Sequence, residues 1–217
     1  MKKILFTLLA VALTLPALAQ RPLHGTRVET IRHNNHQNAT YYGLRLGLGL
    51  AAVHSDDTQL DGGSMQAGLN IGVAAGFQLV PTSPVYIEAG LDFVEKGGKG
   101  THDHKKFTYD LNYIELPIVI KYIYDIDGDF SVQPFLGGYL ACGVGGKVKD
   151  YGERASFSSF DDEYFGRFDG GLRFGCGGQY DVLYAEIAYD LGLTNISNDT
   201  FDSAHNGCLY INVGVNF

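Results

Sequence analysis

The sequence has no tryptophan, little charge and few prolines or cysteines. Its 217 residues include 6 Pro and 3 Cys, and only 18% are Asp, Glu, Lys or Arg. This composition excludes a disordered tail, a coiled coil and a collagen-like chain. Because no apolar run of about 18 residues follows the N-terminal segment, no membrane-spanning helix is predicted. A formal net charge of −8 without a basic run argues against nucleic acid as a partner.

Residues 1–19 combine a basic start, an apolar run from Ile4 to Leu15 and the small-residue pattern Ala17-Leu18-Ala19. These features predict a secretory signal peptide, with a mature chain that begins at Gln20. A membrane anchor is the alternative, but about 16 apolar residues are fewer than a transmembrane helix normally needs. The polar residues 20–40 are expected to form a flexible periplasmic segment.

From residue 41 to residue 217, apolar residues recur at every second position. The alternating segments are 42–50, 68–79, 85–93, 113–122, 130–140, 167–180, 183–191 and 209–217. In the first, Leu44, Leu46 and Leu48 alternate with Arg45 and Gly47. One face is therefore apolar and the other is small or charged, which predicts eight β-strands.

The connections between these segments alternate in length. Residues 53–64, 95–105, 145–164 and 194–206 are long, whereas 81–83, 125–128 and the turn near Asp181 are short. Outer-membrane barrels have long outer loops and short periplasmic turns. The predicted fold is all-β: an eight-stranded antiparallel up-and-down transmembrane β-barrel at residues 41–217, with both termini in the periplasm. A soluble lipocalin-like barrel is the alternative, but its outer face would carry the charges.

Aromatic residues at the segment ends fit the girdles of a membrane barrel. Those at the inner ends are Tyr42, Phe77, Tyr122, Phe130, Tyr180 and Phe217. The last segment carries Leu209, Ile211, Val213, Val215 and Phe217 at alternate positions. This ending resembles the C-terminal strand signal read by the barrel assembly machinery. It implies that machinery and outer-membrane lipid of a Gram-negative cell as partners.

Three stretches carry a resemblance to a known family: Asn112–Tyr122 (NYIELPIVIKY), Pro134–Tyr139 (PFLGGY) and Gly192–Ile196 (GLTNI). They resemble the PorT-type outer-membrane β-barrel family of Bacteroidetes, and the likeness covers residues 41–217. The resemblance implies an OmpA-like or PorT-like barrel integral to the outer membrane. PorT itself is associated with a secretion system that exports surface proteases, which makes a secretion or envelope complex an implied partner.

The inward face of the predicted barrel gathers charged residues. The cations are Arg45, Lys121, Arg167 and Arg173, and the carboxylates are Glu88, Asp92, Glu115, Asp169, Glu186 and Asp190. Unpaired charge is costly to bury, and an eight-stranded lumen is just wide enough for side chains. A paired structural plug is therefore favoured, with a gated ion path as the alternative. No cofactor is implied.

The proline and the cysteines within the predicted strands lead to two further predictions. Pro117 removes a backbone donor inside the fourth segment, and since a closed barrel has no free edge, a β-bulge is predicted beside Glu115. The three cysteines, Cys142, Cys176 and Cys208, are odd in number and differ in depth. Free thiols are expected, with no disulfide framework.

Histidine and acidic residues in the loops give weak signals of metal binding. His102-Asp103-His104 and the pair His33 and His36 have no visible further ligands, so no metal site is predicted. The series Asp125, Asp127, Asp129 resembles the start of a calcium loop, but the turn is too short to complete one. Asp-Gly hairpin chemistry explains this turn better.

An active site at the outer rim has candidate residues but no motif. Ser55, His54, Asp56, Asp57 and His205 are the ingredients of a hydrolase, yet no nucleophile elbow is present. No enzyme is predicted. The third long connection contains Tyr151, Phe157, Phe160 and Tyr164 beside the acidic run 161–163, and these aromatics either dock a partner or fold back on the rim.

The predicted function is that of an integral outer-membrane barrel with a structural or interaction role. The resemblance implies association with protein secretion or envelope assembly. A narrow pore is the alternative, followed by an outer-membrane enzyme with a loop-borne active site.

Overall fold

A computed structural model describes residues 39–55, 65–102, 105–127, 130–150, 155–160, 165–197 and 203–217. The predicted signal peptide and nearly all of the predicted periplasmic segment lie outside the described residues. No helix in the described part of the chain is long and apolar enough to cross a membrane.

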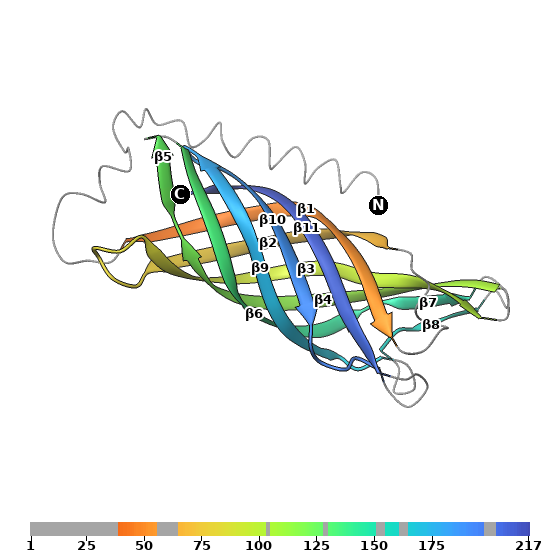
Figure 1. Cartoon of the computed structure of the whole chain (residues 1–217). Helices are drawn as coiled ribbons and strands as arrows, with labels where there is room; N and C mark the ends of the chain where they lie inside the picture. Colours follow the sequence, from red (N-terminus) through yellow and green to blue (C-terminus); the bar gives the residue numbers. More distant parts are fainter. Residues whose placement is uncertain are drawn as a thin grey trace. The chain divides into compact units, whose positions relative to one another are not determined.

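The described residues form β-strands of very different length (Figure 1). The long strands are β1 (Thr40–Ser55), β2 (Gln66–Gln78), β3 (Val85–His102), β4 (Lys105–Tyr122), β6 (Phe130–Gly145), β9 (Phe168–Tyr180), β10 (Leu183–Gly192) and β11 (Ala204–Asn216). The short strands are β5 (Tyr124–Asp127), β7 (Lys147–Asp150) and β8 (Ala155–Ser158).

The eight long strands close into an antiparallel barrel. Each pairs with the next along the chain, and β1 pairs with β11 over thirteen positions from Gly43↔Asn216 to Ser55↔Ala204. Tyr42 and Phe217 exchange two backbone hydrogen bonds of 2.8 and 2.9 Å beside this seam. The predicted eight-stranded up-and-down barrel is confirmed. The end that holds Tyr42 and Phe217 is termed the terminus end, and the opposite end, with the long connections, is the loop end.

Alternation sorts the side chains between the two surfaces of the barrel. Leu48, Leu136 and Ile211 face outward and are 60%, 61% and 57% exposed, whereas Glu115 and Lys121 face inward and are fully buried. The aromatic residues predicted at the inner strand ends are also exposed and lie at the terminus end. A continuous apolar outer face of this extent suits lipid and not water, which excludes the lipocalin-like alternative.

Glycines on the inner face make room for large side chains. A Cβ atom on Gly72 would overlap the Asp92 carboxylate, and one on Gly177 would overlap the Tyr184 ring. The many scattered glycines of the sequence therefore allow charged and aromatic side chains to fill a narrow lumen.

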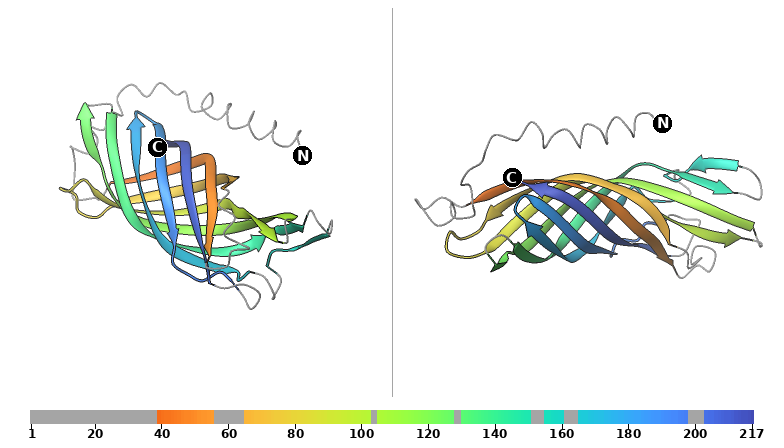
Figure 2. Two further views of the ribbon diagram at one scale, coloured as in Figure 1. Left: turned by 45° about the vertical axis from the view of Figure 1, so that its right-hand side comes forward. Right: turned by 90° about the horizontal axis from the view of Figure 1, so that it is seen from above.

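Strands β3 and β4 continue well beyond the barrel wall, so most of the long connection predicted at 95–105 is strand instead of loop. The Glu95 carboxylate accepts a hydrogen bond of 2.9 Å from the backbone N–H of Leu69, near the last β2–β3 register pair, Asn70↔Val94. Past this point, among the strands that the structure describes, β3 pairs with β4, β4 with β7, and β7 with β8. Figures 1 and 2 show this four-stranded sheet projecting from the loop end. It is termed the extension.

An apolar cluster fills the barrel at the loop end. Tyr109 stacks on Phe165 with ring centroids 5.2 Å apart, and Tyr113 meets the edge of Phe160 at 5.5 Å. Other buried members of the cluster include Leu111, Val53, Ile196 and Ala204. Phe160 thus folds back into the barrel mouth. Of the two roles expected for the aromatic residues of this connection, docking a partner or folding back on the rim, Phe160 takes the second. Tyr151, Tyr164 and residues 161–163 lie outside the described residues, as does the side chain of Phe157.

Pro117 sits in β4 without the predicted bulge. The β4–β6 register is continuous from Tyr113↔Gly143 to Lys121↔Phe135, and it shifts only between Asn112 and Tyr113. Across the other ladder, Gly90 provides the space, because a Cβ there would come within 2.9 Å of the proline ring. A small residue opposite the proline, instead of an inserted one, accommodates the ring.

The three cysteines are free, as expected. Cys142 pairs in register with Phe168 and Cys176 with Pro134, so these two thiols lie far apart along the β6–β9 ladder. Cys208 is buried on β11.

Candidate functional site

The predicted inward charges form two groups inside the barrel. The loop cluster, nearer the loop end, comprises Asp92, Lys96, Glu115, Asp169, Arg173 and Asp190. The terminus cluster comprises Arg45, Glu88, Lys121 and Glu186 with Tyr41 and Tyr184. The alternation of strands explains why these side chains meet, since every second residue of each strand points into the same lumen.

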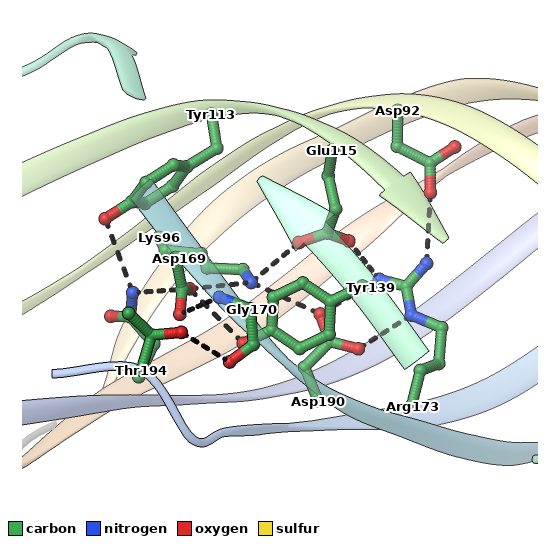
Figure 3. Close-up of polar contacts among 11 residues, drawn as sticks. Asp92, Lys96, Tyr113, Glu115, Tyr139, Asp169, Gly170, Arg173, Asp190 and Thr194 are labelled. Atoms are coloured by element: carbon green, nitrogen blue, oxygen red, sulfur yellow. Dashed lines mark hydrogen bonds and ion pairs between the residues drawn. The ribbon is translucent and has the colours of Figure 1, made fainter. Parts of the chain in front are cut away.

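Arg173 is the centre of the loop cluster (Figure 3). Its Nε donates to Asp190 Oδ1 at 2.6 Å, its Nη1 donates to Asp92 Oδ2 at 3.1 Å, and its Nη2 donates to Glu115. One guanidinium from β9 therefore joins carboxylates of β3, β4 and β10. The planar fork of arginine suits this arrangement, because it offers five donors in fixed directions.

Lys96 is the second cation of the loop cluster, and the sequence reasoning missed it. Its Nζ lies 2.7 Å from Glu115, 3.2 Å from Asp190 and 3.7 Å from Asp169. The predicted strand ended before Glu95, so Lys96 was assigned to a loop. The signal that could have found it is the continued alternation Glu88, Asp92, Lys96 on even positions of β3.

Neutral donors hold Asp169, the one carboxylate of the loop cluster that Arg173 does not contact. Tyr139 Oη donates to Asp169 Oδ2 at 3.2 Å, and Asn206 Nδ2 donates to the same oxygen at 2.9 Å. The backbone N–H of Gly170 donates to Oδ1 at 2.8 Å. With two cations against four carboxylates, the loop cluster depends on such neutral donors to satisfy its oxygens.

The terminus cluster balances two cations with two carboxylates. Glu88 Oε2 accepts from Lys121 at 2.7 Å and from the Tyr41 hydroxyl at 2.5 Å, and Arg45 lies 3.6 Å away. Tyr184 joins the two halves, because its hydroxyl accepts from Lys121 at 3.0 Å and donates to Glu186 at 2.8 Å. The Arg45 guanidinium also lies 4.0 Å from the centre of the Tyr184 ring.

A small cavity lies between the two clusters. Its volume is about 30 Å³, and its lining includes Arg45, Glu88, Asp92, Arg173 and Glu186. A volume of this size is enough for about one or two water molecules. The two charge clusters and the apolar cluster at the loop end together place large side chains along the lumen.

Arg167 is the exception among the predicted inward charges. It is exposed at the barrel rim, where its guanidinium donates to the carbonyl oxygens of Gly143 at 3.2 Å and Phe160 at 3.5 Å. The prediction that it faces the lumen is wrong, because β9 begins at Phe168 and the alternation does not extend to the residue before it. Arg167 instead holds Phe160 in the barrel mouth, with its guanidinium 5.6 Å from the ring.

Of the other candidate histidine and serine residues, the structure describes the side chains of His54, Ser55 and His205. His54 and His205 are register partners on β1 and β11, and Ser55 Oγ donates to the carbonyl of Ser203 at 3.0 Å. Asp56, Asp57, Asp103, His104, His33, His36 and Asp129 lie outside the described residues, as do the side chains of His102 and Asp127. Among the residues that are described, no group of three or more His, Cys, Asp or Glu could hold a metal ion.

Comparison with known proteins identifies the class. A family model described as outer membrane protein beta-barrel domain matches residues 32–198. The chain therefore belongs to this family of outer-membrane β-barrel domains. No curated protein matches the sequence.

Similar solved structures come from several bacteria. A major outer membrane protein of Thermus thermophilus is 14% identical, with 82% of this chain and 100% of that chain covered and a TM-score of 0.51. Neisserial surface protein A is 16% identical, with 82% and 99% covered and a TM-score of 0.50. The attachment invasion locus protein of Yersinia pestis is 14% identical, with 82% and 98% covered and a TM-score of 0.43.

Proposed function

We propose that the protein is a non-conducting outer-membrane scaffold whose barrel anchors the extension as an interaction surface. The observation that carries this proposal is the occupied lumen: two charge clusters and an apolar cluster lie in it, and the cavity between the charge clusters measures about 30 Å³. A barrel built this way offers no route for solutes. Beyond the barrel wall, the largest structure among the described residues is the sheet formed by β3, β4, β7 and β8. Neither an enzymatic activity nor a cofactor is part of the proposal.

The proposal includes an orientation and an export route. The loop end faces the cell exterior and the terminus end faces the periplasm. This orientation follows from the short connections, which lie at the same end of the barrel as Tyr42 and Phe217. Residues 1–19 act as the signal peptide, and residues 20–40 form a periplasmic segment. The barrel assembly machinery recognises the last strand, whose residues Ile211, Val213 and Phe217 are exposed on the outer face.

The proposed partner is a secretion or envelope complex. The resemblance of residues 112–122 to PorT-type barrels of Bacteroidetes supports this partner, and so does the extension, which is far larger than a simple turn needs to be. Affinity capture from intact envelopes with the full chain, and with a variant that lacks residues 147–158, would test it. Loss of a captured complex on deletion supports the proposal, and unchanged capture by the shortened, folded barrel contradicts a role for β7 and β8.

Conductance tests the central statement. Purified protein whose gel mobility shifts on heating, the mark of a closed barrel in detergent, is inserted into planar lipid bilayers. No steady single-channel current is expected for the wild-type protein or for Phe160→Ala. Steady currents from the wild-type protein would instead establish the narrow pore.

A further inference from the structure

The lysines of the chain have an uneven distribution. Seven lysines follow the predicted signal peptide, of which Lys96 and Lys121 are buried in the lumen. The other five all lie in the extension: Lys99 on β3, Lys105 and Lys106 at the start of β4, and Lys147 and Lys149 on β7. A chain with a formal net charge of −8 thus collects its remaining lysines on one small sheet.

Register places three of these lysines on one face. Lys99 pairs with Thr108 of β4, and Thr108 pairs with Lys149 of β7, so the three side chains form a row across three strands. Lys147 lies two residues before Lys149 and shares its face. Lys99, Lys147 and Lys149 are all exposed, and the face they form is termed the lysine face.

The lysine face has an excess of positive charge. Asp110 lies on the same side of β4 and pairs with Lys149 at 3.4 Å, with both side chains partly exposed. Among the described residues, no carboxylate lies within ion-pairing distance of Lys99 or Lys147. Surface lysines that are paired with neighbouring carboxylates would attract an anion only weakly, but this face leaves two of its three described cations free to do so.

By strand alternation, the lysine face lies on the same side of β4 as the lipid-facing residues of the barrel wall. On β4 the outward positions change from apolar Ile118, Leu116 and Ile114 to polar Asn112 and Asp110. Asp110 lies about 13 Å along the strand from Ile114, which strand tilt reduces to about 10 Å of height above the apolar band. Headgroups occupy a layer roughly 5 to 8 Å thick at this level, and lysine side chains extend several Å toward such a layer.

We propose that the lysine face binds the phosphate groups of outer-leaflet glycolipids of the lipid A type. Charge complementarity selects a phosphorylated ligand, and continuity with the lipid-facing surface selects a lipid instead of a soluble anion. Lys147 is nearest the barrel and contacts the headgroup phosphate, while Lys99 and Lys149 contact phosphates farther from the hydrocarbon. The inference rests on the proposed orientation, which places the loop end in the outer leaflet.

Binding to mixed micelles tests the proposal. Full-length folded protein is titrated with micelles that contain diphosphoryl lipid A, monophosphoryl lipid A or phosphatidylcholine at equal mole fraction. The wild-type protein is expected to bind diphosphoryl lipid A most tightly, and the triple variant Lys99→Gln, Lys147→Gln, Lys149→Gln is expected to bind it about 100-fold more weakly. Equal binding by the triple variant, or no preference of the wild-type protein for phosphate, overturns the proposal.

Two matched variants separate charge from folding. The triple variant with arginine at the same three positions keeps the charge and should retain affinity within a few-fold. Asp110→Asn removes the opposing carboxylate and should strengthen binding several-fold. A heat-dependent gel shift in every variant shows that the barrel is intact, and weak binding by a folded arginine variant contradicts a purely electrostatic contact with phosphate.

Labelling of intact cells tests the orientation separately. A membrane-impermeant amine reagent should modify Lys99, Lys147 and Lys149 without cell lysis, as read by mass spectrometry of the purified chain. Labelling only after lysis would overturn the proposed orientation and the outer-leaflet assignment. Because the micelle assay does not depend on orientation, it would still report whether the lysine face recognises phosphate.

Discussion

The loop cluster and the terminus cluster are two arrangements of buried charge in one lumen. In the loop cluster, two cations serve four carboxylates, and Arg173 alone contacts three of them. In the terminus cluster, cations and carboxylates are equal in number, and the tyrosine hydroxyls of Tyr41 and Tyr184 carry several of the contacts. In the first, each cation contacts several carboxylates; in the second, a tyrosine hydroxyl links the lysine to a second carboxylate.

This difference predicts how each cluster fails. Removal of a shared cation leaves several buried carboxylates unpaired at once, and unpaired buried charge is the most costly arrangement. Removal of one member of the terminus cluster leaves hydroxyls that can still donate or accept. Stability should therefore depend more steeply on single residues of the loop cluster.

Arg173→Ala should have the largest effect. It leaves Asp92, Glu115 and Asp190 without their common partner, and a loss of about 4 kcal/mol of unfolding free energy is expected. Because the chain has no tryptophan, urea unfolding in lipid vesicles is best followed by gel mobility. Arg173→Lys, which keeps the charge but not the fork, should recover part of the loss. A loss below about 1 kcal/mol would show that the carboxylates find other partners.

Lys96→Met should rank second, with a loss of about 3 kcal/mol in the same measurement. Arg173 still serves Glu115 and Asp190, so only Asp169 loses its cation. Lys99→Met, three residues along β3 and exposed, is the matched control and should change stability by less than about 0.5 kcal/mol. Equal effects of the two substitutions would contradict a structural role for the buried lysine.

Glu88→Gln tests the terminus cluster and should cost about 2 kcal/mol. The amide keeps an acceptor for Lys121 and Tyr41 but loses the charge opposite Lys121 and Arg45. Glu186 remains as a second carboxylate beside Tyr184. A loss as large as that of Arg173→Ala would remove the contrast between the two clusters.

The sequence predicts the barrel well because strand alternation is a local property. Residues two apart share a face, so inward positions such as Glu115, Lys121 and Arg173 follow once a segment is recognised as a strand. Errors come at strand ends, where local pattern stops being informative. Lys96 was missed because β3 continues past Glu95, and Arg167 was misplaced because β9 begins one residue later.

Partner choice inside the lumen could not be predicted from sequence. Arg173 and Asp92 are 81 residues apart and meet only because the barrel closes. The short strands β7 and β8 span four residues each, too few for a pattern of alternation to stand out. The lysine face depends on both, since it exists only when β7 pairs with β4.

Tyr184→Phe should have the smallest effect and bears most directly on the comparison. It removes a hydroxyl that links Lys121 to Glu186 but keeps the ring against which Arg45 packs. A loss of about 1 kcal/mol is expected, the usual contribution of one buried hydrogen bond. Tyr122→Phe, an exposed tyrosine of the outer face, is the control and should be neutral within error. If Tyr184→Phe approached Lys96→Met in cost, the hydroxyl would be an essential member of the ionic network, and the terminus cluster would share charge as the loop cluster does.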